Sequence, residues 1–225
     1  MRLLATKKLS LSLKDRLIQH GFSVVEQPFI QIEPLPINID STKDHLIFTS
    51  QNAVKIAFSN AHIRPLLEGK KYYCVGEKTK SILEENGQKV IKTAQNSAKL
   101  VDFLKKTLKN ERFSFFCGKL RRPEIEDFFQ DNQISYDIFE IYNTTLTPKA
   151  LDTTFNGILF FSPSAVSSFF KANSWKPQTQ GFCIGKTTAS ALKKFTPNYS
   201  IAKEASEAQL FLCIHNYYTR HHAEK

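Results

Sequence analysis

The sequence predicts an α/β fold with two flavodoxin-like parallel-sheet domains, and the first observation behind this prediction is an internal repeat. The segment Leu46-Ile47-Phe48-Thr49-Ser50-Gln51-Asn52-Ala53-Val54 returns as Leu159-Phe160-Phe161-Ser162-Pro163-Ser164-Ala165-Val166, and Cys74-Val75-Gly76-Glu77-Lys78-Thr79 returns as Cys183-Ile184-Gly185-Lys186-Thr187-Thr188. Ser162 lies 112 positions after Ser50, and Gly185 lies 109 positions after Gly76. Two copies are too few for a solenoid, which needs at least about three units, so the repeat indicates a duplicated domain.

The second observation is a regular alternation of short apolar runs with helical patterns, which is typical of βαβ units and a mostly parallel sheet. In the middle of the chain we expect strands at 46–49, 72–75, 89–91, 113–117 and 138–142, with helices at 53–60, 78–86, 98–108 and 124–130. The last third has only three strand patterns, at 158–161, 182–184 and 199–202, each followed by a helix. It is therefore two strands short of the middle block.

The N-terminal segment supplies the missing pair. It reads as a strand at 2–5, a helix at 12–20 and a strand at 24–32, and its counterpart in the middle block is 113–142. We therefore expect one discontinuous domain of residues 1–33 plus 151–225 and one continuous domain of residues 37–143. Residues 34–36 and 144–150 form a two-stranded linker, where prolines favour extended chain.

The repeated motifs lie where a strand gives way to a helix. Ser50 and Ser162 fall at N-cap positions, where a hydroxyl accepts a bond from an unpaired helix N–H, and Pro163 suits the first helical position. Gly76 and Gly185 let the backbone turn closely before Thr79, Thr187 and Thr188 open the next helices. Helix N-termini at this edge of an open sheet are good receptors for carboxylate or phosphate, although each cap taken alone is equally an ordinary structural one.

Charge and motifs exclude several classes of protein. The net charge of +10 favours a polyanionic partner, or it is a solvated basic surface. No zinc-finger spacing, basic helix or RNP-like strand indicates nucleic-acid binding, and the four dispersed cysteines suit core positions better than a metal site or disulfides. Gly185-Lys186-Thr187 lacks the earlier glycine of a P-loop, because position 180 is Gln180. The dinucleotide fingerprint is absent too, so we expect neither metal nor cofactor.

Catalytic constellations are also absent. None of the six histidines pairs with a cysteine, serine or carboxylate at a telling spacing, and there is no H-E-x-x-H or G-x-S-x-G. An enzyme with this sequence would depend on positioning and charge stabilisation more than on a dedicated nucleophile.

Taken together and in order, the motifs resemble those of the uroporphyrinogen-III synthase family. The resemblance runs over nearly the full length and is carried by six segments, namely Phe48-Thr49-Ser50 with Asn52-Ala53-Val54, Val75-Gly76, Cys117-Gly118-Lys119-Leu120-Arg121-Arg122, Ile141-Tyr142-Asn143-Thr144, Phe160-Phe161-Ser162-Pro163-Ser164 and Ile184-Gly185-Lys186-Thr187-Thr188-Ala189. It implies two α/β domains joined by a two-stranded linker, the arrangement that the strand count also predicts.

The resemblance also implies a reaction. The linear tetrapyrrole hydroxymethylbilane, with eight carboxylates, loses water, has its last pyrrole ring inverted through a spiro intermediate and closes as uroporphyrinogen III. Because the substrate ionises readily and closes unaided to the wrong isomer, the protein's task is mostly geometric. Tyr142 matches a family tyrosine at the cleft, and it either donates to the departing hydroxyl or stabilises a charged intermediate, or else packs as a structural tyrosine between domains.

For substrate binding we expect hydroxyl groups, glycines and two basic side chains at the strand ends. The expected residues are Thr49, Ser50, Gly76, Lys119, Arg122, Ser162, Ser164, Gly185, Thr187 and Thr188. Arg122 is equally a solvated helix-start residue. The chain departs from many bacterial relatives at Thr6-Lys7, where they have Thr-Arg, and at Gln51, which replaces a common proline. Lysine presents a point charge and not a fork, which puts a bidentate carboxylate contact there in doubt.

We expect the protein to be cytoplasmic, because the chain shows neither a bilayer-spanning apolar run nor a secretory signal pattern. We also expect a monomer, because no exposed apolar helix remains once the two sheets are covered. The competing hypothesis is an intracellular two-lobed binding protein for a small polyanion. Activity on hydroxymethylbilane separates the two hypotheses.

Overall fold

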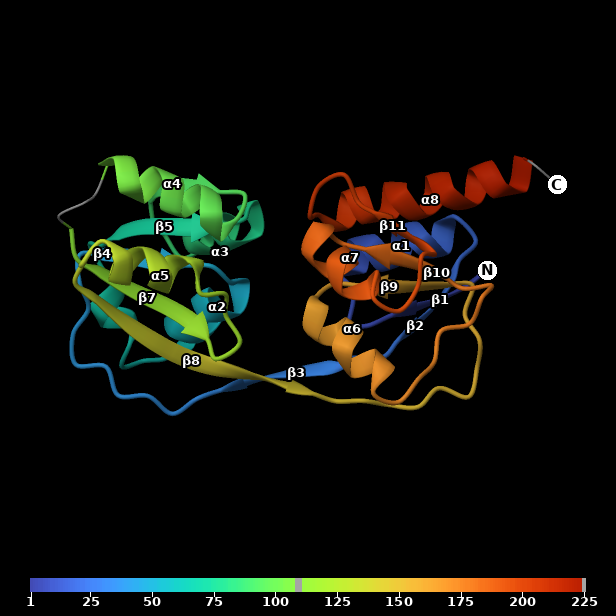
Figure 1. Ribbon diagram of the computed structural model, residues 1–225, viewed down its shortest axis with the longest axis horizontal. Coiled ribbons are helices and arrows are strands. Elements are labelled where there is room, and N and C mark those ends of the chain that lie inside the picture. The colour runs from blue at the N-terminus through green and yellow to red at the C-terminus, as the bar shows by residue number, and fades with distance from the viewer. Residues whose placement is uncertain (108–110, 224–225) are drawn as a thin grey trace. The chain divides into compact units, whose positions relative to one another are not determined.

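The computed structural model describes residues 1–107 and 111–223 and folds them into two compact units (Figure 1). Unit 1 comprises Met1–Gln31 with Thr145–Lys225, and unit 2 comprises Ile32–Thr144. Each unit contains five parallel strands with helices on both faces, to which unit 2 adds one antiparallel edge strand at residues 30–34, and this confirms the predicted α/β fold class. No helix within the described ranges has the length and apolar character needed to cross a membrane.

The sheet of unit 1 has five parallel strands, and the N-terminal segment provides two of them. The strands are β1 (Arg2–Ala5), β2 (Ser23–Glu26), β9 (Gly157–Phe160), β10 (Gln180–Cys183) and β11 (Tyr199–Ile201), in the spatial order β11-β10-β9-β1-β2. Counted within the unit, this is the flavodoxin order 2-1-3-4-5. The N-terminal segment therefore completes the C-terminal sheet, as the strand count predicts.

Successive side chains of these strands face opposite layers of helices, as they must in a pleated strand. Leu3 and Phe182 pack in one core with α1 (Leu11–Gln19) and α8 (Glu207–Ala223). Leu4 and Phe160 pack in the other core with α6 (Pro163–Phe170) and α7 (Lys186–Leu192). Burial on both faces explains why these strands are apolar without interruption.

The sheet of unit 2 repeats the same neighbour order with one extra strand. Its strands are β3 (Ile30–Pro34), β4 (His45–Phe48), β5 (Lys71–Val75), β6 (Val90–Ala94), β7 (Phe113–Gly118) and β8 (Tyr136–Leu146), in the order β3-β8-β7-β4-β5-β6. Here β7 and β8 stand where β1 and β2 stand in unit 1, while β4, β5 and β6 correspond to β9, β10 and β11. The two sheets thus share one spatial order with a permuted chain order.

Two layers of helices cover this sheet as well. One core contains α2 (Gln51–Ser59), the 3₁₀ helix η1 (Arg64–Leu67) and α3 (Glu77–Glu85), packed against Phe48 and Tyr72. The other contains α4 (Ser97–Thr107) and α5 (Glu124–Asp131), packed against Phe113 and Phe115. The expected helix at 98–108 is therefore α4, although its expected last residue, Leu108, lies outside the described residues.

The expected strand at 24–32 is wrong, because the structure divides it into β2 and β3. The break falls at Gln27-Pro28-Phe29, where Pro28 has no N–H to continue a ladder and the buried Phe29 donates its N–H to Thr6 O at 3.2 Å. After the break, β3 pairs with β8 in the sheet of unit 2. This pairing is also why β8 is longer than the expected 138–142.

Candidate active site

The expected site residues cluster at the carboxyl edge of each sheet. Strands β4 and β5 end at Phe48 and Val75, and β9 and β10 end at Phe160 and Cys183, so that the repeated motifs follow directly. Thr49, Ser50, Gly76, Ser162, Ser164 and Gly185 are all half-buried at these ends, whereas Thr187 is exposed and Thr188 is buried. The carboxyl edge is where open α/β sheets bind ligands.

Ser50 and Ser162 cap their helices, as predicted. The Ser50 hydroxyl accepts the Asn52 N–H at 3.1 Å, and the Ser162 hydroxyl accepts the Ala165 N–H at 3.1 Å. Pro163 takes the first helical position of α6. Both serines thus satisfy one of the four N–H groups that a helix start leaves unpaired.

The two glycines of the repeated motif differ. Gly76 adopts φ +86° before α3 and donates its N–H to Ala94 O at 2.8 Å, so its backbone requires glycine. Gly185 has φ −173°, and an added Cβ would lie 3.7 Å from the Ala205 Cβ, which is an ordinary contact. The expectation of a close backbone turn is therefore right for Gly76 and wrong for Gly185, where the chain is simply extended.

Tyr142 lies on β8 within reach of one of these caps. Its hydroxyl donates to the Ser50 Oγ at 3.0 Å, and only 8% of the residue is exposed. Burial raises the pKa of the Tyr142 phenol, and the hydrogen bond to Ser50 partly opposes that shift. Tyr142 is therefore a neutral donor at ordinary pH, and the contact joins residues that are 92 positions apart.

Gly118 makes room for this tyrosine. A Cβ at position 118 would lie 2.5 Å from Cε2 and Cζ of the Tyr142 ring, which no packed structure tolerates. The ladder also shifts by one residue between Cys117 and Gly118, so that Gly118 stands opposite Tyr142. The Lys119 N–H then donates to Tyr142 O at 3.0 Å. The end of β7 thus fixes both the backbone and the ring of Tyr142.

The basic segment after β7 contains one arginine that is held by two carboxylates and two basic side chains that are exposed. Arg121 binds both Glu126 oxygens, at 2.6 and 2.8 Å, and also pairs with Glu140. These contacts, Glu126 first, raise the pKa of Arg121. Lys119 is exposed, and Arg122 has a side chain 55% exposed with a loose 3.6 Å contact to Glu124. Of the segment, only Lys119 and Arg122 remain accessible to a carboxylate ligand.

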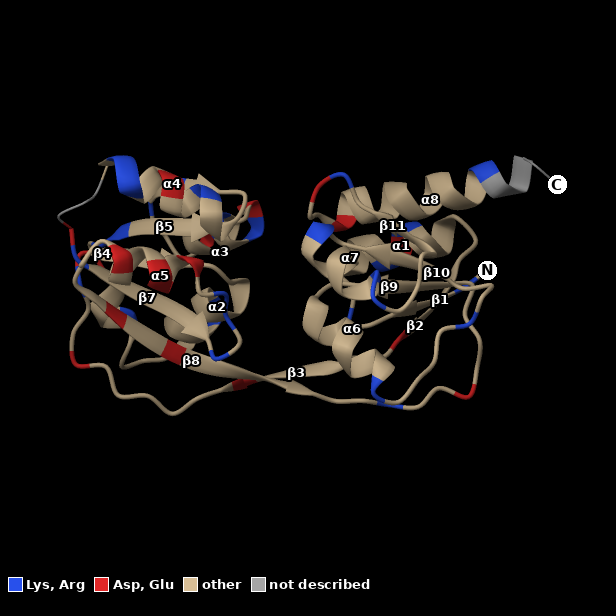
Figure 2. Ribbon diagram, viewed as in Figure 1, with Lys and Arg blue, Asp and Glu red and all other residues tan. Residues whose placement is uncertain are grey.

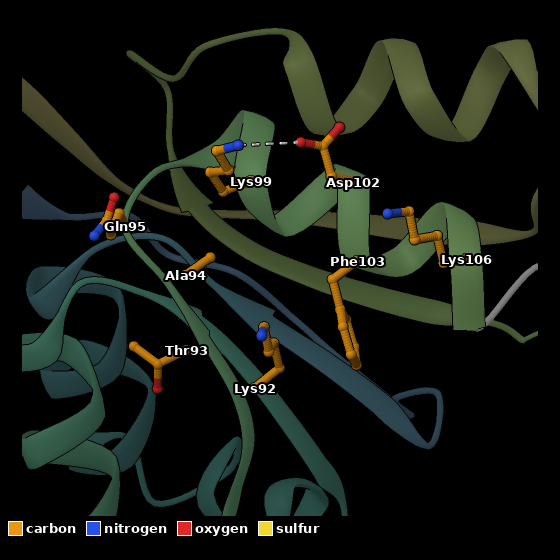
Figure 3. A pocket seen from close by; sticks show the side chains of 8 residues that line it. All are labelled: Lys92, Thr93, Ala94, Gln95, Lys99, Asp102, Phe103 and Lys106. Carbon is orange, nitrogen blue, oxygen red and sulfur yellow. Dashed lines mark ion pairs between the residues drawn. The ribbon is translucent and has the colours of Figure 1, made fainter.

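A lysine-rich pocket of about 380 Å³ lies between β6 and α4 (Figure 3). Lys92, Lys99 and Lys106 line it together with one acidic residue, Asp102, whose carboxylate is 3.9 Å from the Lys99 amine. The Lys92 amine lies 5.0 Å from the centre of the Phe103 ring. Our sequence analysis missed this cluster, although the seven-residue spacing of Lys99 and Lys106 on one helix face was visible.

Lys7, which follows β1 of unit 1 as Lys119 follows β7 of unit 2, is already neutralised. The Lys7 amine binds Glu207 at 2.7 Å and stands 4.5 Å above the Phe161 ring. Lys and Arg elsewhere are spread over both units and interspersed with Asp and Glu (Figure 2). The excess of positive charge is therefore distributed, with the lysine-rich pocket as a local concentration.

One histidine has the carboxylate partner that the sequence did not reveal. His45 begins β4 and is buried, with Nε2 at 3.1 Å from a Glu111 oxygen and Nδ1 at 3.0 Å from the Tyr73 hydroxyl. Burial lowers the pKa of His45 more than Glu111 raises it. Because His45 lies at the amino end of its strand, away from Ser50 and Gly76, this cluster is structural.

Comparison with known proteins decides the family. A sequence model of the family described as uroporphyrinogen-III synthase HemD matches residues 12–211, which is most of the chain. The chain belongs to the uroporphyrinogen-III synthase family. The resemblance of the six sequence segments is thereby confirmed.

A curated relative of this synthase family is longer than the chain. The porphyrin biosynthesis protein HemD of Ruminiclostridium josui is 25% identical over 225 residues, which cover 89% of this chain and 45% of the relative. The chain thus spans about half the length of the curated relative it matches.

Solved structures of uroporphyrinogen-III synthases share the fold. The uroporphyrinogen-III synthetase of Helicobacter pylori superimposes with a TM-score of 0.72 at 18% identity, covering 96% of this chain and 100% of that one. A mutant uroporphyrinogen III synthase of the extremely thermophilic bacterium Thermus thermophilus gives a TM-score of 0.68 at 15% identity, covering 98% and 99%. At such identities the likeness concerns the fold alone.

Proposed function

We propose that this chain is a uroporphyrinogen-III synthase, a lyase that converts hydroxymethylbilane into uroporphyrinogen III with loss of water and inversion of ring D. The observation that carries the proposal is the Tyr142–Ser50 hydroxyl pair at the start of α2, in a chain of this family. A neutral donor beside a helix N-terminus favours a reaction in which negative charge develops on a departing oxygen.

The substrate's carboxylates fit the remaining features of the carboxyl edges. Helix starts at Ser50, Gly76, Ser162 and Gly185 present N–H groups, which suit carboxylates. Side chains that we assign to substrate binding are those of Thr49, Ser50, Lys119, Arg122, Ser162, Ser164, Thr187 and Thr188. Tyr142 is the residue to which we assign a role in the chemical step.

The proposal includes the setting in which the protein acts. We infer a cytoplasmic monomer with a small-molecule substrate, without nucleic-acid or membrane partners, cofactor or metal. The proposed domain division is 1–33 with 151–225, and 37–143, with linker strands between them.

The test is an isomer assay. Hydroxymethylbilane is generated with a deaminase in the presence of the purified protein, and the products are oxidised and separated by chromatography as porphyrin isomers. We expect a shift from isomer I, the product of unaided closure, to isomer III. Isomer I alone, from folded protein, would leave a binding protein for a small polyanion as the better account.

A further inference from the structure

In the hydrogen bond between Tyr142 and Ser50 at the start of α2, the tyrosine is the donor and the serine is the acceptor. The Ser50 oxygen accepts two hydrogen bonds, from the Asn52 N–H at 3.1 Å and from the Tyr142 hydroxyl at 3.0 Å. A serine hydroxyl has two acceptor lone pairs and one proton. Both lone pairs of the Ser50 oxygen are therefore occupied, and the Ser50 proton is the one donor that the pair has left.

The opposite direction is disfavoured by burial. If Ser50 donated to Tyr142 instead, the phenol proton would need another acceptor, and the bond to Ser50 is the one hydrogen bond that the Tyr142 hydroxyl makes among the described residues. Leaving a buried hydroxyl proton unpaired costs its full desolvation free energy. Tyr142 is 8% exposed, whereas Ser50 is only half-buried, so the serine is the member of the pair that a ligand can reach.

We propose that Ser50 is the catalytic residue that donates a proton to the departing hydroxyl of the substrate. Tyr142, whose ring fills the space at Gly118, then replaces the Ser50 proton through the hydrogen bond between the two hydroxyls. This inference rests on the proposed synthase function. It assigns the direct contact to the serine, and it makes Tyr142 a positioning residue and proton source.

The step balances as follows. The C–O bond of the hydroxymethyl group breaks with its electron pair going to oxygen, the Ser50 proton joins that oxygen to form water, and the Tyr142 proton moves to Ser50. Formation of the last carbon–carbon bond releases a proton from the attacked pyrrole carbon, and that proton returns through Ser50 to Tyr142. The net change is loss of one water, and no oxidant or reductant is needed.

The experiment compares Ser50→Ala, Tyr142→Phe and the double variant in the isomer assay, each with kcat, KM and melting temperature. We expect each single variant to lower kcat for isomer III about ten- to a hundredfold, the range of a positioned proton donor, with KM changed less than about threefold. The double variant should be no more than about threefold slower than the slower single variant, because both changes interrupt the same path.

Two further variants separate chemistry from folding. Ser50→Gly keeps a residue that is accepted at helix N-caps but removes the hydroxyl, and it should match Ser50→Ala in kcat. Ser50→Thr retains the hydroxyl and should restore kcat to within about threefold of wild type. Ser162→Ala removes the matching cap of unit 1 and shows, through its melting temperature, the effect of losing a cap alone.

The outcomes distinguish the two levels of inference. If wild-type protein yields isomer I alone, the synthase function fails, and the proton relay from Tyr142 through Ser50 to the substrate fails with it. If wild-type protein yields isomer III while Ser50→Ala and Ser50→Gly remain within about twofold of its kcat, the synthase stands and the relay is overturned, because a positioned donor is worth more than that. Independent, multiplicative losses in the double variant would also overturn the relay.

Discussion

Ser50 and Ser162 begin equivalent helices in the two units, yet only one of them is connected to a buried tyrosine. Both hydroxyls accept a helix N–H at 3.1 Å, and Ser50 alone, among the residues that the structure describes, also accepts a tyrosine hydroxyl. The cap is what folding requires of both copies. The added contact distinguishes two copies of a common fold, and it belongs to the tyrosine to which we assign the proposed chemistry.

The strands beside the two caps explain the difference. In unit 2, Gly118 at the end of β7 leaves the space that the Tyr142 ring fills. In unit 1, the corresponding strand β1 is followed by Thr6, whose hydroxyl donates to Leu159 O at 2.8 Å and is buried. In unit 1 the side chain at this position therefore links the end of β1 to β9.

The largest expected effect comes from closing the space at Gly118. Gly118→Ala should displace the Tyr142 ring and lower kcat at least about tenfold, because misplacing a reacting group by about 1 Å can cost up to about a hundredfold. Overpacking should also lower the free energy of unfolding by about 1–3 kcal/mol. Steady-state kinetics and chemical denaturation measure the two effects.

Gly181→Ala provides the matched control in unit 1. Its added Cβ would lie 2.5 Å from the Leu192 Cδ2 and 3.3 Å from Asn198 O and the Tyr199 Cβ, an equally close contact that does not involve Tyr142. We expect a loss of stability of similar size, about 1–3 kcal/mol, with kcat unchanged. Equal kcat losses in both variants would mean that Gly118 acts only through general packing.

Substitutions of Gly76 and Gly185, the glycines of the second repeated motif, should have a smaller effect that also tests the difference between the two units. Gly76→Ala places a side chain at φ +86° and should cost about 1–3 kcal/mol in the free energy of unfolding. Gly185→Ala, at φ −173°, should change it by less than about 0.5 kcal/mol. Thermal denaturation of both variants is the measurement, and equal losses would contradict the asymmetry.

The lysine-rich pocket predicts a binding effect in unit 2, and the pocket at the equivalent place in unit 1, between β11 and α8, is lined by only two basic residues, Lys203 and Arg220. Lys92→Gln with Lys99→Gln and Lys106→Gln should raise KM about three- to tenfold with kcat unchanged, because exposed charges contribute up to about 1 kcal/mol each and salt screens them. The control is Lys14→Gln in unit 1, which pairs with Glu26 and lies outside the expected site. An unchanged KM, or a change that persists at high salt, would remove the pocket from substrate binding.

Local sequence was sufficient for the features that depend on neighbouring residues. The caps at Ser50 and Ser162, the proline at position 163 and the strand ends were predictable because each is a relation within a few residues. The completion of the C-terminal sheet by the N-terminal segment was predictable from the repeat, since equivalent segments require equivalent partners. The divided strand at 24–32 was missed, because only the pairing of β3 with β8 explains it.

Side-chain partnerships across the sheet were not predictable in this way. The Tyr142–Ser50 bond depends on the register shift at Gly118, which no local pattern encodes. Two consecutive arginines look alike in sequence, yet Arg121 is committed to Glu126 while Arg122 is exposed. Such choices depend on which side of a turn faces the neighbouring helix and on residues far apart in the chain.

The smallest expected effect is on the pH dependence of stability, which His45 should give to unit 2. Burial lowers the pKa of His45 below 6.5, so the unfolded chain binds the proton more readily than the folded one. The stability from keeping His45 neutral is therefore complete only well above pH 6.5 and is lost as the pH falls through 6.5 toward the folded-state pKa. We expect the melting temperature of unit 2 to fall between about pH 7.5 and 5, and His45→Gln to reduce that dependence.

The control is His62→Gln, which changes an exposed histidine and should leave the pH dependence as in wild type. The same slope in His45→Gln as in wild type would mean that another group titrates, since the Glu111 carboxylate beside His45 favours the protonated ring and opposes the effect of burial.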